Sequence, residues 1–89
     1  MASLNLAALA SILRGKDPAE PRDVEAQFLR GEEIATLRQM FLDTYGEQGD
    51  IAKALEAGNV AELGAALGQA NPPLDSNPEI VRIAQDLLG

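Results

Sequence analysis

The longest run of hydrophobic positions with helical spacing extends from residue 24 to residue 45. Its apolar residues recur every three or four positions, which is the repeat of one face of an α-helix. Gly31 lies inside the run, and we expect one long helix with a weak point or bend there, because an internal glycine costs about 1 kcal/mol relative to alanine. Gly46 follows the run and is a natural helix end. The run holds all three aromatic residues of the chain, which are Phe28, Phe41 and Tyr45.

Shorter helical patterns surround this run. They are predicted over residues 4–13, 50–57, 59–70 and from about residue 76 to the end. Asp50 and Asn59 are expected to cap two of them, and Pro72 and Pro73 stop the helix before the last one. No stretch alternates apolar and polar residues in the manner of a strand, so we expect no sheet. The sequence therefore predicts an all-α fold, a small orthogonal bundle of four to five helices in a single domain covering residues 1–89.

The hydrophobic core should centre on the long helix and be covered by the later ones. Its predicted centre consists of Val24, Phe28, Ile34, Leu37, Phe41 and Tyr45. Its predicted cover consists of Ile51, Leu55, Leu63, Leu67, Ile80 and Leu87. With 89 residues and many alanines, such a core is modest, which favours self-association or a partner.

The first predicted helix is open to two interpretations. It can dock on the core of its own domain, or residues 1–15 can form an arm that docks on a partner or on a second copy. We prefer the first interpretation. The second is motivated by the connector of residues 16–22, which carries two prolines and four charges. The candidate partner-binding residues are then Leu6, Leu9, Ile12 and Leu13. The helix is too short to span a membrane, and it lacks the features of a signal peptide.

The amino-acid composition excludes the commonest kinds of catalytic site. The chain has no cysteine and no histidine, so it lacks thiolate nucleophiles, the commonest general base and the commonest ligand of transition metals. The sequence shows no phosphate-binding glycine loop, nucleophile elbow or metal-ligand spacing. We therefore predict a protein that is not an enzyme and uses no cofactor and no metal.

The net charge of −7 is unevenly distributed. Residues 1–42 contain six acidic and five basic residues, whereas residues 43–89 contain eight acidic and two basic residues. This imbalance argues against direct binding of nucleic acid, which requires clustered Lys and Arg. It is compatible with a basic protein partner. A cysteine-free chain also suits a reducing compartment, and we expect a cytoplasmic location.

Residues 54–75 resemble the helix pair of an ankyrin repeat, through Ala57-Gly58-Asn59, Leu63 and Leu67. The resemblance covers one unit and lacks the opening turn motif of that family. The same segment is similar to a helical piece of galactokinase-type kinases, whose phosphate loop is absent here. The resemblances therefore imply two short helices joined by a tight turn and no activity.

Three functions fit these observations. The first is a non-catalytic protein–protein interaction module or small regulatory subunit, whose partner is another protein or a second copy of the chain. The second is an acidic inhibitor that covers a basic, nucleic-acid-binding surface, motivated by the excess charge of residues 43–89. The third is an accessory subunit of a larger enzyme, which sequence patterns do not distinguish from the first.

Overall fold

The computed structural model describes residues 4–15 and 22–89. This part of the chain forms five α-helices and one short 3₁₀ helix, and it contains no strand. The elements are α1 (Leu6–Leu13), α2 (Val24–Tyr45), α3 (Asp50–Ala57), α4 (Val60–Gly68), η1 (Leu74–Ser76) and α5 (Pro78–Leu88). The predicted all-α bundle is confirmed, and η1 is an element that the sequence patterns did not indicate.

α2 is continuous through Gly31, so the predicted weak point is neither a break nor an end. A β-carbon added at Gly31 would have no neighbour within 4 Å, which shows that this side of the helix is open. The helix begins after Asp23, whose carboxylate accepts a hydrogen bond from the amide of Glu25 at 2.9 Å. The sequence Asp17-Pro18-Ala19-Glu20 matches a capping box, and these residues lie outside the described part of the chain.

The other helices begin at asparagine caps or end at glycine. The side chains of Asn5, Asn59 and Asn77 each accept a bond from an amide in the first turn of α1, α4 and α5, which satisfies a donor that the helix leaves free. Gly58 ends α3 in the left-handed conformation at φ +80°. Asp50 is not the cap that was predicted, because α3 begins at Asp50 itself and Gly49 occupies the capping position.

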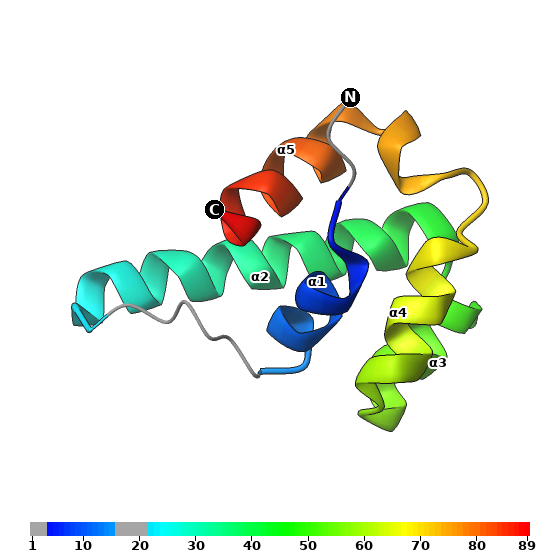
Figure 1. The fold of residues 1–89 in the computed structure, drawn as a ribbon, viewed down its shortest axis with the longest axis horizontal. Helices are drawn as coiled ribbons and strands as arrows, with labels where there is room; N and C mark the ends of the chain where they lie inside the picture. The colour runs from blue at the N-terminus through cyan, green and yellow to red at the C-terminus, as the bar shows by residue number, and fades with distance from the viewer. Residues whose placement is uncertain (1–3, 16–21) are drawn as a thin grey trace.

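Figure 1 shows α2 as the long axis of the molecule, with the α3–α4 pair crossing it steeply at one end. α5 packs along the middle of α2, and α1 lies among α2, α4 and α5. The opposite end of α2, drawn in cyan, extends beyond both α1 and α5. The N-terminal turns of α2 therefore project from the bundle.

One hydrophobic cluster draws on every helix. Eight core residues are confirmed as buried: Leu37, Phe41, Ile51, Leu55, Leu63, Leu67, Ile80 and Leu87. Ile34 and Tyr45 are half-buried against this cluster. The prediction is wrong for Val24 and Phe28, which are exposed, because the projecting end of α2 has no helix packed over them.

The first helix is part of this core. Leu9, Ala10, Ile12 and Leu13 are at most 3% exposed and belong to the same cluster. Two arginines fix the end of α1 to its neighbours. Arg38 of α2 donates to the carbonyl of Leu13 through Nε at 3.0 Å, and Arg14 donates to the carbonyl of Leu55 in α3. The structure thus shows α1 docked on the core of its own chain.

Candidate functional site

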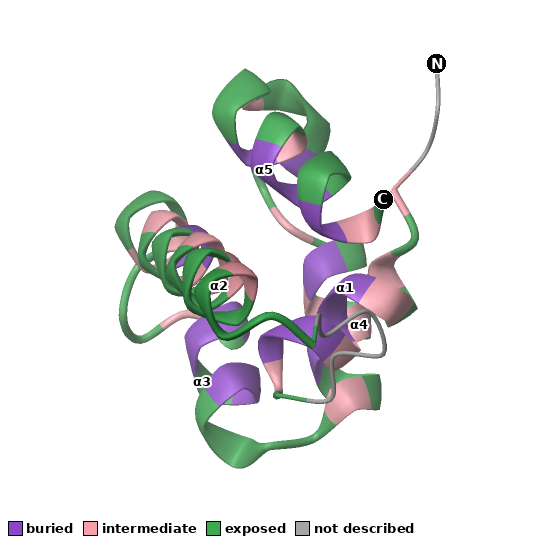
Figure 2. Cartoon of the chain, turned by 90° about the vertical axis from the view of Figure 1, so that its left-hand side faces the viewer, coloured by how far each residue is buried: buried purple, intermediate pink, exposed green. Residues whose placement is uncertain are grey.

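The clearest candidate site is the exposed end of α2, by which we mean Val24, Phe28 and Leu29. These side chains are 78%, 64% and 54% exposed. Among residues 4–15 and 22–89, the other large hydrophobic side chains are buried or half-buried. Figure 2 views the molecule from this end, where the near turns of α2 are mostly exposed. Single exposed apolar residues are normal, whereas three within six positions at one helix end mark a candidate contact surface.

The polar residues around this patch differ in direction. Arg30 turns toward the bundle and donates from Nη2 to the carbonyl of Leu87 in α5 at 2.6 Å. Glu25 and Glu32 are exposed, and the helical repeat places them together along one edge of the helix face that bears Phe28. These two carboxylates therefore lie between Phe28 and Leu29 around the helix, and Phe28 shares its face with Val24.

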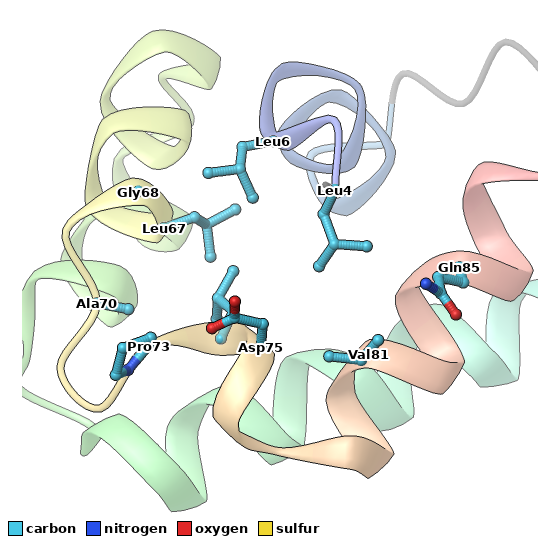
Figure 3. A pocket seen from close by; sticks show the side chains of 10 residues that line it. Leu4, Leu6, Leu67, Gly68, Ala70, Pro73, Asp75, Val81 and Gln85 are labelled. Atoms are coloured by element: carbon cyan, nitrogen blue, oxygen red, sulfur yellow. The ribbon is translucent and has the colours of Figure 1, made fainter. Parts of the chain in front are cut away.

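A second apolar surface is a hollow of about 350 Å³ between α1, α4, η1 and α5. Its walls are mainly apolar and include Leu4 and Leu6 on one side and Leu67 and Val81 on others (Figure 3). The carboxylate of Asp75 stands among these apolar side chains. The hollow has the chemistry to hold an apolar group with a cationic end, since Asp75 is the charged residue in its lining.

Asp75 also affects the last turn of α2. The hydroxyl of Tyr45 donates to the carbonyl of Pro72 at 2.7 Å, which fixes the turn after α4 to α2. Burial raises the pKa of the Tyr45 hydroxyl, and the negative charge of Asp75 raises this pKa further. Both effects favour the protonated hydroxyl that makes the bond.

The residues predicted to bind a partner are separated by the structure. Leu9, Ile12 and Leu13 lie inside the core, so a partner does not reach them while α1 stays docked. Leu6 is half-buried and lines the hollow, and it remains accessible. In the folded chain these four leucine and isoleucine side chains do not form one partner surface, because three of them face inward.

The part of the chain that the structure describes contains no group of three or more acidic, cysteine or histidine residues placed to hold a metal ion. No helix within residues 4–15 and 22–89 combines the length and the apolar character needed to cross a membrane. Comparison with known protein families, curated proteins and solved structures finds no match to this chain. The two apolar surfaces must therefore be interpreted from their own chemistry.

The exposed end of α2 was missed although the sequence carried a signal for it. Phe28 and Leu37 are nine positions apart, which is about two and a half turns of a continuous helix with 3.6 residues per turn. Once α2 is taken as one helix, the two residues must point in opposite directions. Because Leu37 lies in the core, Phe28 had to face outward.

Proposed function

We propose that the chain is a non-catalytic protein–protein interaction module whose contact surface is the exposed end of α2. One observation supports this function above the others. Val24, Phe28 and Leu29 are more than half exposed on a helix end that projects from the bundle. Water around these exposed apolar side chains is released when a partner covers them, and this release favours association.

The surface fits a known mode of recognition. A helix that presents apolar residues three or four positions apart can lie in the groove of a partner. Aromatic residues at the centre of an interface often account for much of the binding energy, so we assign Phe28 the central role. This function needs no catalytic group and no cofactor. The proposal includes a cytoplasmic location, which a chain without cysteine permits.

An acidic inhibitor of a basic, nucleic-acid-binding surface is the second candidate. The observation in its favour is that all eight acidic residues of 43–89 are exposed, so their charge is available to a partner. Such binding should weaken steeply with added salt, because screening acts on exposed charges. Apolar binding through α2 should change little or strengthen with salt.

The test compares three forms of the chain, each immobilised and exposed to an extract at low and high salt. They are the natural chain, the Phe28→Ser variant and the control variant Ala65→Ser, which changes an exposed residue of α4. We expect proteins that are retained by the natural chain and the control to be lost with Phe28→Ser at both salt concentrations. Proteins that all three forms retain equally would contradict the assignment of the surface. Loss of every retained protein at high salt would favour the acidic inhibitor.

A further inference from the structure

We infer that the partner of the exposed end of α2 is a second copy of this chain, paired antiparallel along α2. The inference rests on the proposed function, and it names the occupant of that surface. It is based on a row of residues that we call the α2 stripe, which consists of Val24, Phe28, Gly31 and Ala35. All four are exposed, and helical geometry places them along one face of α2.

The α2 stripe has the same spacing in both directions. Its members are separated by four, three and four positions, so a second copy running the opposite way presents the same series. With a two-fold axis between residues 29 and 30, Phe28 of one copy lies over Gly31 of the other. Val24 then lies over Ala35 of the second copy. An isologous two-fold interface requires this kind of self-complementary surface.

Each close pair in this arrangement joins a large side chain to a small one. A β-carbon added at Gly31 would meet nothing within 4 Å, so the space above Gly31 is open to the ring of Phe28 from the second copy. Small residues let two helix backbones approach while large ones fill the gap between them, which gives the dense packing of protein interiors. A parallel pair would instead set Phe28 against Phe28 and leave Gly31 facing Gly31.

The rest of the bundle leaves room for the second copy. Leu37 and Phe41, which define the core side of α2, are completely buried. The α2 stripe lies well away from that side, because Phe28 and Leu37 point in opposite directions. In the pair, the two α2 helices are therefore central and the two bundles lie outside them.

The area and charges of this contact favour a weak pair. A specific, stable interface buries about 1,200–2,000 Å² in total and uses about 20–30 residues on each side, and one face of residues 24–35 offers far fewer. The antiparallel arrangement brings Glu25 near Glu32 of the second copy, which is unfavourable. We expect a reversible pair that strengthens when salt screens the Glu25 and Glu32 carboxylates of both copies.

Disulfide trapping tests the arrangement directly, because the natural chain has no cysteine. Two variants of the full chain, Val24→Cys and Ala35→Cys, are oxidised separately and as a mixture. Residues 24 and 35 are about 16 Å apart along a helix, whereas a disulfide requires α-carbons within about 7 Å. In the proposed register neither variant crosslinks with itself. The mixture forms the mixed disulfide dimer, and its yield drops when Phe28→Ser is introduced into both chains.

Other results would overturn the inference in distinguishable ways. A Val24→Cys dimer without the mixed dimer would show a parallel contact. Absence of any crosslink, together with a heterologous partner that is lost on Phe28→Ser, would overturn the second copy as occupant while the proposed function stands. If Phe28→Ser destabilises the monomer as much as removal of a core side chain does, the ring is covered by its own chain. Both the inference and the proposed function would then fail.

Discussion

Phe28 and Leu37 stand on the same uninterrupted helix and point in opposite directions. Leu37 is completely buried, whereas Phe28 remains 64% exposed. No other helix of the described residues covers Phe28 as the core covers Leu37, because α5 and α1 cover α2 only from its middle onward (Figure 1). One end of α2 therefore contributes side chains to the core, and the other end presents an exposed apolar surface.

The two phenylalanines should differ sharply in their contribution to stability. Phe41→Ala removes a completely buried ring and should lower the free energy of unfolding by about 3–5 kcal/mol. Phe28→Ala removes an exposed ring and should change it by about 0.5 kcal/mol or less. Urea unfolding at low protein concentration, followed by circular dichroism, measures both. Equal losses in the two variants would show that Phe28 is buried in the native chain.

Gly31→Ala should stabilise the monomer. Gly31 lies inside α2 without a positive φ angle, and an added β-carbon has no neighbour within 4 Å, so the helix should gain about 0.5–1 kcal/mol from the better helix former. Gly58→Ala is the matched control. There the φ angle is +80° and the β-carbon would lie 2.8 Å from Nη2 of Arg14, so that variant should lose stability. The unfolding temperatures of both variants, measured at low concentration, test this prediction. A lower unfolding temperature for Gly31→Ala would mean that the surroundings of Gly31 are not open.

α1 should prove essential to the fold. Leu13 is completely buried, and Leu13→Ala should lower the free energy of unfolding by about 2–5 kcal/mol. Leu6→Ala is the control, because Leu6 is only half-buried at the edge of the hollow, and its loss should be smaller. Removal of residues 1–15 should abolish cooperative unfolding, as seen by circular dichroism during heating. A truncated chain that unfolds cooperatively at an unchanged temperature would support the dispensable arm instead.

Tyr45 should make stability fall at high pH. Burial, followed by the charge of Asp75, raises the pKa of its hydroxyl in the folded chain. Below about pH 10 both folded and unfolded chains hold this proton, so the stabilising effect is fully present there. As pH rises further, Tyr45 loses its proton first in the unfolded chain. Its stabilising effect on the folded chain is then lost as the pH passes the pKa of Tyr45 in the folded chain.

This titration can be followed without interference, because Tyr45 is the only tyrosine. Its phenolate absorbance should rise at higher pH in the folded chain than in the unfolded chain. Asp75→Asn removes the second cause of the shift and should move the folded titration part of the way back. A folded titration that coincides with the unfolded one would exclude the predicted loss of stability.

Helical spacing was enough to predict the all-α fold and most of the core. Local signals also predicted a helix end after residue 57 and Asn59 as a cap, since both depend on the adjacent backbone. Spacing did not show how far a neighbouring helix extends along α2, and this long-range packing decides that Val24 and Phe28 are exposed. The same is true of α1, where the pattern of leucines does not indicate whether the core they enter belongs to their own chain. Leu74 was missed because η1 is too short to show a repeat.

The most direct test of the α2 surface is light scattering on a sizing column over about a hundredfold range of concentration, since mass action must shift a reversible pair. We predict that the molar mass of the natural chain rises with concentration from that of one copy toward that of two, and that it rises at lower concentration when the salt concentration is high. The control Ala65→Ser changes an exposed residue of α4, away from α2, and should behave like the natural chain, while Phe28→Ser should remain a monomer throughout. A natural chain that stays monomeric at every concentration and salt, or a Phe28→Ser variant that associates equally well, would contradict pairing through α2.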